Sequence, residues 1–238
     1  MSASIAVVLP CYNPAPGWVE RLVTRFEAFA AGYPAGQVHL TLVHDGTPGG
    51  LAPAALAELR ARLPRMQFLD ATVNRGKGFA LRRGMAAAPA GADVYLYTDI
   101  DLPYTLDSMR RVVAHVRARG GVAAGERFED YYDGVPAFRR YLSKAHRLLM
   151  RTAFRLPVSD SQAGLKAFDA AGRAVFLETT TDRFLVDLDF IARSRGRVEV
   201  APVRVELRPD VQFTDFGLSI LRAEAGNFVR ILREAWLR

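Results

Sequence analysis

The sequence predicts an α/β domain built on a mostly parallel sheet with helices on both faces. Short apolar runs of strand length alternate with amphipathic segments over roughly the first hundred residues, and the connections between them are short. The first run, 5–9, is continuously apolar, as in a strand buried on both faces. With 238 residues, half of them hydrophobic, the chain can bury such a core.

Four strand and helix pairs make up the predicted first half. Pro10 closes the first strand, and the apolar residues from Trp18 to Phe29 recur at helical spacing. Thr105 is a suitable N-cap for the last of these helices. The expected strands span 5–9, 38–43, 66–69 and 94–98, and the expected helices span 18–29, 54–63, 79–88 and 105–119.

Polar loops follow all four of these strands. The carboxyl ends of parallel strands meet at one edge of a sheet, so the loops are expected to form one site. They carry Tyr12-Asn13, His44-Asp45-Gly46, Asn74-Arg75-Gly76-Lys77-Gly78 and Asp99-Ile100-Asp101.

The acidic pair Asp99 and Asp101 indicates the chemistry of this edge. Carboxylates suit hard cations such as Mg²⁺ or Mn²⁺, which accompany diphosphates in enzymes. An isolated Asp-x-Asp is also typical of a solvated acidic turn. The neighbouring loop favours a metal-assisted nucleotide site, because Gly76 permits close backbone approach and Arg75 and Lys77 can neutralise a diphosphate.

The second half is organised differently. A strand at 122–125 leads to a polar, tyrosine-rich stretch, and a basic helix, an acidic helix start, a further strand and a basic amphipathic helix follow. We expect one domain over 1–215, with the helix of 216–238 as part of it or packed on it. The later segments span 129–135, 138–154, 182–189, 198–207 and 216–236.

The cysteine count, the apolar runs and the net charge limit the classes of protein to which this chain could belong. A single cysteine, Cys11, excludes an internal disulfide framework, and no apolar run reaches the roughly 20 residues that cross a bilayer. The N-terminus has no basic region typical of a signal peptide, so a cytoplasmic protein is expected. The net charge of +7 implies attraction to polyanions, which also fits a non-catalytic basic binding protein. Acids at the strand ends argue against a nucleic-acid site.

Seven segments together resemble a known family. Four of them occur in the order and spacing of family 2 glycosyltransferases of the GT-A fold, and the later ones resemble dolichyl-phosphate glucose and mannose synthases, over nearly the whole chain. The first four are Val7-Val8-Leu9-Pro10-Cys11-Tyr12-Asn13, His44-Asp45-Gly46-Thr47, Asn74-Arg75-Gly76-Lys77-Gly78 and Asp99-Ile100-Asp101-Leu102. The later ones are Gly125-Glu126-Arg127-Phe128, Asp160-Ser161-Gln162-Ala163-Gly164-Leu165-Lys166-Ala167-Phe168, and Phe184-Leu185-Val186-Asp187-Leu188-Asp189 followed by Ala201-Pro202-Val203.

The resemblance implies a metal-dependent, inverting transfer of a sugar from a nucleoside diphosphate (UDP- or GDP-linked) to a polyprenyl phosphate. The reaction would occur at the cytoplasmic face of a membrane. The C-terminal helix could lie on an anionic membrane surface or simply pack on the core. A soluble enzyme acting on a glycan or small-molecule hydroxyl is the alternative.

The resemblance also implies roles for residues on the donor side. Asp101 would bind Mg²⁺ or Mn²⁺, and Asp99 would bind the metal or the ribose. The aromatic ring of Tyr12 suits stacking on a base, although packing in the core is its alternative role. The nucleotide-sugar contacts would come from Pro10, Tyr12, Asn13, Asp45, Arg75, Gly76, Lys77, Asp99, Gln162 and Lys166. Relatives usually carry two adjacent acids where this chain has His44-Asp45.

On the acceptor side, Asp187 and Asp189 match the position of a general base. A hydroxyl acceptor needs such a base, whereas a phosphate monoester is largely ionised near neutrality. The alternative is that both are surface acids favoured at a helix start. The acceptor phosphate would be bound by Arg127, Arg139 or Arg140, and Arg208.

Overall fold

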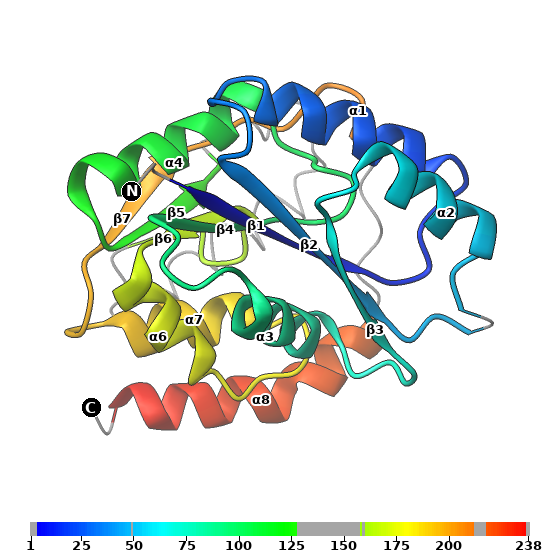
Figure 1. The fold of residues 1–238 in the computed structure, drawn as a ribbon. Helices are drawn as coiled ribbons and strands as arrows, with labels where there is room; N and C mark the ends of the chain where they lie inside the picture. The colour runs from blue at the N-terminus through cyan, green and yellow to red at the C-terminus, as the bar shows by residue number, and fades with distance from the viewer. Residues whose placement is uncertain (1–3, 49, 128–157, 159, 212–217, 237–238) are drawn as a thin grey trace.

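The computed structural model describes residues 4–48, 50–127, 158, 160–211 and 218–236. Its first half confirms the predicted alternation of strands and helices (Figure 1). Strands β1 and β2 run further than predicted, since backbone pairing continues through the pairs Cys11↔His44 and Asp45↔Ala71. The elements are β1 (Ile5–Cys11), α1 (Trp18–Ala30), β2 (Val38–Asp45), α2 (Pro53–Arg62), β3 (Gln67–Ala71), α3 (Lys77–Ala87), β4 (Val94–Tyr97) and α4 (Leu106–Arg119).

The second half extends the sheet and reverses one strand. The seven strands lie in the order β3-β2-β1-β4-β6-β5-β7, and β6 runs antiparallel to both of its neighbours. The sheet is therefore mostly parallel, as predicted. The remaining elements are β5 (Val122–Glu126), β6 (Lys166–Phe168), α6 (Ala170–Leu177), α7 (Val186–Ser194), β7 (Val200–Arg204) and α8 (Leu218–Trp236). The loop predicted at 129–135 and the helix predicted at 138–154 lie outside the described residues.

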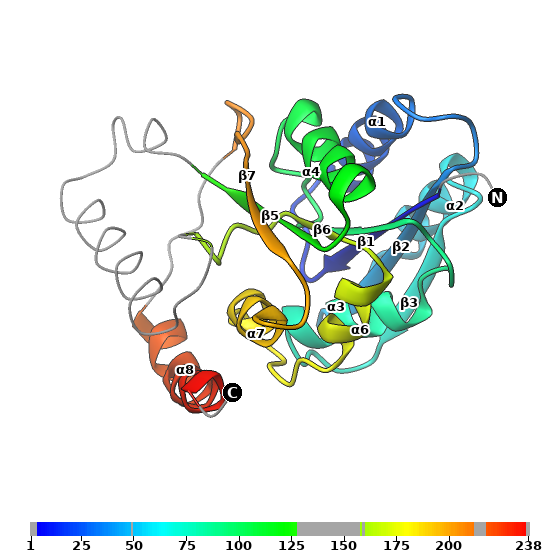
Figure 2. The ribbon, with the colours of Figure 1, turned by 90° about the vertical axis from the view of Figure 1, so that its left-hand side faces the viewer.

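Helices cover both faces of the sheet (Figures 1 and 2). Helices α1, α2 and α4 lie on one face, α3, α6 and α7 lie on the other, and α8 packs outside α7. Successive residues of β1 face opposite cores: Val7 and Leu9 pack in the cluster with α1 and α4, whereas Ala6 and Val8 pack in the cluster with α3 and α7. This two-sided burial explains why the strand sequence is continuously apolar.

Close contact between α3 and the sheet depends on Gly84. A Cβ atom at Gly84 would lie 2.4 Å from Val8 Cγ1 and 2.8 Å from Val43 Cγ2. We expect Gly84→Ala to lower the free energy of unfolding by about 1–3 kcal/mol through overpacking, as measured by urea denaturation. Gly226→Ala is the matched helix control, because no heavy atom lies within 4 Å of its Cβ position. Equal urea midpoints for both variants would contradict the prediction.

Candidate active site

Asp45 holds the loop between β3 and α3. Its Oδ1 accepts from the Arg75 N–H at 3.0 Å, and its Oδ2 accepts from the Gly76 N–H at 2.8 Å and the Asn74 amide at 2.9 Å. Burial raises the pKa of Asp45, against the effect of the two backbone donors. The side chain is 3% exposed. Its oxygens thus position the residues predicted to bind a diphosphate, while its predicted contact with the nucleoside stays a prediction.

His44 links the loop after β2 to strand β3, and Thr47 links the same loop to the loop after β1. The Thr47 N–H donates to its Nε2 at 2.8 Å, so Nδ1 carries the proton that is shared with Asp70 Oδ1 at 2.6 Å. Thr47 Oγ1 in turn accepts from the Asn13 N–H at 2.8 Å. Tyr12, next in the chain, is 50% exposed, so the alternative that it packs in the core is wrong. Its ring is accessible for stacking at this edge.

The turn after β4, Asp99-Ile100-Asp101-Leu102, is called here the acidic turn, and it lies against α3. Lys77, the first residue of α3, places Nζ 2.7 Å from Asp99 Oδ1. The turn closes through a hydrogen bond from the Leu102 N–H to the Asp99 carbonyl at 2.9 Å, and Leu102 has a φ of +45°. That left-handed conformation costs a non-glycine residue about 1–2 kcal/mol. A Cβ at Gly164 would lie 2.7 Å from Asp99 Oδ2, so the glycine keeps space beside the carboxylate.

Asp187 lies behind this turn in a buried ionic cluster. Its Oδ1 accepts from the Tyr97 hydroxyl at 2.7 Å and from Lys166 Nζ at 2.8 Å, and its Oδ2 is 4.0 Å from Lys77 Nζ. Lys166 also donates to the Ala163 carbonyl. Burial works to lower the pKa of Lys77, but Asp99 and Asp187 raise it further, so Lys77 stays cationic. The alternative of surface acids is wrong for Asp187.

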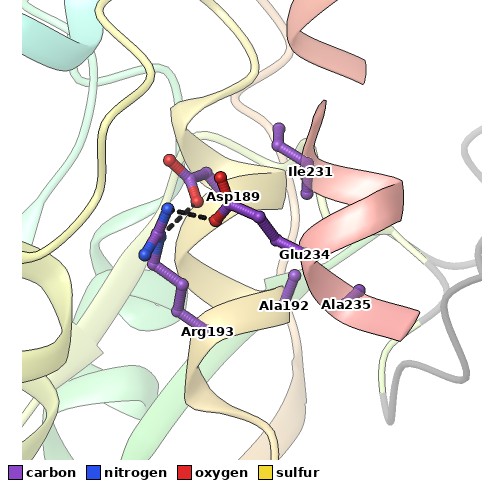
Figure 3. Close-up of a pocket in the computed structure, with 6 residues that line it drawn as sticks. All are labelled: Asp189, Ala192, Arg193, Ile231, Glu234 and Ala235. Carbon is purple, nitrogen blue, oxygen red and sulfur yellow. Dashed lines mark hydrogen bonds and ion pairs between the residues drawn. The ribbon is translucent and has the colours of Figure 1, made fainter. Parts of the chain in front are cut away.

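Asp189 is buried too and ties α7 to its surroundings. Its Oδ2 accepts from the N–H groups of Thr180 and Thr181 at 2.8 and 3.0 Å, and its Oδ1 accepts from Arg193 Nε at 2.6 Å. Arg193 also donates to Glu234 of α8 at 2.6 Å, as Figure 3 shows. Asp189 is therefore not a surface acid either, and both its oxygens have donors.

Two of the arginines predicted to bind the acceptor contact acids or carbonyls. Arg127 forms a bidentate pair with the buried Asp160, with Nε–Oδ2 at 2.7 Å and Nη2–Oδ1 at 3.1 Å. Arg208 donates to the carbonyls of Leu102 and Asp101 at 2.9 and 3.3 Å. These two side chains hold the chain around the acidic turn and the end of β5.

Of the remaining predicted residues, Gln162 and Pro10 are described by the structure, whereas the other two are not. The buried Nε2 of Gln162 has no hydrogen-bond partner among the described residues, and Pro10 is half-buried at the end of β1. Arg139 and Arg140 lie outside the described residues. Burial raises the pKa of Cys11 to about 12, so its thiol is not activated as a nucleophile near neutral pH.

Comparison with known proteins agrees with this geometry. No protein-family model matches the chain. Glycosyltransferase AglD of Haloferax volcanii is 27% identical over 236 residues, which cover 98% of this chain and 37% of AglD. A dolichyl-phosphate beta-glucosyltransferase of Drosophila melanogaster is 25% identical over 205 residues, which cover 80% of this chain and 62% of that protein. The sequence is therefore similar to those of curated glycosyltransferases, one of which is named for a dolichyl-phosphate acceptor. It spans less than two thirds of either relative's length.

Solved structures show the fold of this glycosyltransferase relative. Mannosyl-3-phosphoglycerate synthase from Rubrobacter xylanophilus matches with a TM-score of 0.67 at 15% identity, over 97% of this chain and 73% of that one. Mannosyltransferase PcManGT from Pyrobaculum calidifontis, solved with GDP-Man and Mn²⁺, matches with a TM-score of 0.61 at 18% identity, over 87% of this chain and 57% of that one. The predicted GT-A fold is confirmed.

The acidic turn of this glycosyltransferase relative suits a shared cation better than a complete protein cage. The described residues contain no group of three or more His, Cys, Asp or Glu side chains that could hold a metal ion. Asp99 and Asp101 supply two carboxylates, and partial desolvation and the charge of Asp99 raise the pKa of Asp101. Mg²⁺ and similar cations often take one or two carboxylates and complete their shell with phosphate oxygens and water. The residues present fit that type of binding.

Proposed function

We propose that this chain transfers a sugar from a UDP- or GDP-linked donor to a polyprenyl phosphate, with a divalent cation and inversion at the sugar carbon. The curated relatives support sugar transfer, and the name of the Drosophila relative supports a lipid phosphate acceptor. The Mn²⁺ and GDP-Man bound to PcManGT support the cofactor and the class of donor.

The donor half of the proposal assigns the nucleotide to the edge formed by β1, β2 and β4. Tyr12 would stack on the base, and Asp101, with Asp99, would hold Mg²⁺ or Mn²⁺. The cation would neutralise the charge of the departing nucleoside diphosphate. Lys77 is a second cation for that diphosphate, and its ion pair with Asp99 at 2.7 Å keeps it at the same place.

One observation favours a phosphate acceptor over a hydroxyl. A general base needs a free lone pair within hydrogen-bond reach of the acceptor. Asp187 accepts from Tyr97 and Lys166, and Asp189 accepts from two backbone N–H groups and Arg193. Asp189 has donors on both oxygens, and Asp187 is 1% exposed with two lysine ammonium groups beside it, so neither carboxylate is placed to take a proton from a hydroxyl acceptor. A phosphate monoester has a second pKa of about 6, so it attacks without giving up a proton to the enzyme.

The acceptor phosphate would be bound by Arg127, Arg208 and the segment that contains Arg139 and Arg140. Arg127 would have to share its guanidinium between Asp160 and the phosphate, and Arg208 would have to share its guanidinium between the acidic turn and the phosphate. Bidentate guanidinium contacts suit a phosphate oxyanion. The four arginines therefore remain the candidates for the acceptor site.

Helix α8 supports association with a membrane surface. Its Ile231 and Ala235 pack in the core, whereas Val229, Arg233 and Trp236 are exposed. An exposed face that joins apolar, aromatic and cationic side chains suits an anionic interface. None of the described helices combines the length and apolarity needed to cross a bilayer.

Transfer of labelled sugar tests the proposal directly. The purified chain is incubated with UDP- and GDP-sugars, Mn²⁺ or Mg²⁺, and a polyprenyl phosphate, and the label is then partitioned between chloroform and water. We expect metal-dependent label in the chloroform phase that is lost on addition of EDTA. The anomeric configuration of the product, measured by NMR, is expected to be opposite to that of the donor.

Two other outcomes would contradict the proposal. Label only in a water-soluble product, formed with a glycan or small-molecule acceptor, would favour the soluble hydroxyl transferase. An absence of metal-dependent turnover with every donor, together with salt-sensitive binding to RNA or anionic vesicles, would favour the non-catalytic basic protein.

A further inference from the structure

Two arginines from distant parts of the chain bind the backbone of the acidic turn. Arg25 of α1 donates from Nη1 to the carbonyl oxygen of Asp101 at 2.6 Å. Arg208, which follows β7, donates from Nη2 to the same oxygen at 3.3 Å and from Nε to the Leu102 carbonyl at 2.9 Å. Three charge-assisted donors thus converge on two successive peptides of the turn.

Asp210 fixes the two arginines relative to each other. Its Oδ2 accepts from Arg25 Nη2 at 3.0 Å, and both its oxygens lie 2.6 Å from Arg208 Nη1. Desolvation and the charge of Arg208 lower the pKa of Arg25, while Asp210 and Asp101 act in the opposite direction. The two cations repel each other, and Asp210 offsets that cost. The three side chains act as one unit, called here the arginine clamp (Arg25, Arg208 and Asp210).

The clamp supplies what the sequence of the turn lacks. Leu102 has a left-handed φ of +45°, a conformation that glycine adopts easily and leucine does not. The single backbone hydrogen bond across the turn leaves the Asp101 carbonyl without a partner within the turn. Because the clamp holds that carbonyl, the peptide after Asp101 cannot rotate freely. The direction of the Asp101 Cα–Cβ bond is fixed as a result.

We propose that Arg25, together with Arg208 and Asp210, is a positioning residue that orients Asp101 toward a divalent cation. Arg25 acts through the backbone of the turn and contacts neither donor nor acceptor. The inference rests on the proposed function, since it requires a cation at Asp101. Partners that orient a metal ligand typically change metal affinity by about 10- to 100-fold when they are removed.

Mn²⁺ binding to the full chain, followed by electron paramagnetic resonance in the presence of GDP or UDP, tests the inference. We expect Arg25→Met to weaken Mn²⁺ binding by about 10- to 100-fold. The Mn²⁺ concentration that gives half-maximal turnover should rise in parallel, while turnover at saturating Mn²⁺ changes little. Arg25→Lys should recover part of the affinity, because an ammonium can still donate to the carbonyl.

Asp210→Asn is a second variant that does not depend on buried packing, since Asp210 is 59% exposed. It should weaken Mn²⁺ binding less than Arg25→Met does. Arg111→Met is the matched control: Arg111, on α4, also donates to a backbone carbonyl, that of Arg204 at 2.8 Å, but not to the acidic turn. It should bind Mn²⁺ as the wild type does.

The outcomes separate this inference from the proposed function. If the wild type binds Mn²⁺ and both Arg25→Met and Asp210→Asn bind it equally well, the positioning role is overturned while the proposed function stands. The same holds if Arg111→Met loses as much affinity as Arg25→Met. If the wild type binds no Mn²⁺ with either nucleotide, the metal-dependent function fails and the inference fails with it.

Discussion

Asp101→Ala is expected to lower metal-dependent sugar transfer by about 10²- to 10³-fold, the range seen when one preorganised electrostatic contact to the transition state is removed. The cation would lose one of its two protein carboxylates, and the departing diphosphate would lose part of its neutralisation. Stability should change little. Asp101 is exposed, and removing it relieves the repulsion from Asp99 that raises its pKa. Transfer at saturating donor, and the melting temperature by circular dichroism, measure the two effects.

Asp107→Ala is the matched control for this variant. Asp107 is an exposed aspartate in the first turn of α4, and its partner is Arg111 rather than the acidic turn. The control should keep full transfer. Turnover of Asp101→Ala equal to that of the control would refute the metal role of Asp101.

Sequence patterns were sufficient to predict that the polar loops meet at one edge of the sheet. A continuously apolar strand indicates that both faces of the sheet are buried. Such burial is typical of parallel strands that are connected by helices lying on the two faces. The polar residues that follow β1, β2 and β4 are therefore brought to one edge. Contacts between different loops illustrate this: the Asn13 N–H donates to Thr47, the Arg75 N–H donates to Asp45, and Lys77 pairs with Asp99.

The partners of individual side chains were harder to predict, because they come from distant segments. Asp45 was expected to face a nucleoside, yet the Arg75 and Gly76 N–H groups bind its carboxylate. Asp187 was expected to be a general base or, alternatively, a surface acid, yet the reversed strand β6 places Lys166 opposite Tyr97 and so beside Asp187. No local period marks a three-residue antiparallel strand.

Two residues of the site have roles that the sequence patterns did not predict. Arg25 lies on a helix whose apolar spacing predicts packing and says nothing of its polar face. Its partner, the Asp101 carbonyl, is a backbone group that every residue has. His44 stands where the family resemblance leads us to expect an acid, and that departure was the available signal that it holds Thr47 of the following loop and Asp70 of β3. Both act on backbone geometry rather than on a ligand.

Asp187→Ala is expected to lower the free energy of unfolding by about 3–5 kcal/mol, because it leaves a buried cation without its counter-charge. Lys166 is fully buried and would lose the carboxylate at 2.8 Å while keeping its hydrogen bond to the Ala163 carbonyl, and the Tyr97 hydroxyl would lose its acceptor. Burial raises the pKa of Tyr97, and because that effect persists in the variant, its hydroxyl does not compensate by ionising. Urea denaturation at pH 7 measures the loss.

A double-mutant cycle with Lys166→Met separates a structural ion pair from a catalytic base. If the pair is structural, the double variant should be markedly more stable than Asp187→Ala alone, because no buried charge is left unpaired. The exposed pair Glu178 and Arg197 is the control, and its coupling should be close to zero. A base would give a different pattern: Asp187→Asn would keep wild-type stability and lose transfer to any hydroxyl acceptor. Near-zero coupling between Asp187 and Lys166 with that pattern would contradict the ion-pair role and, with it, the argument for an acceptor that is already ionised.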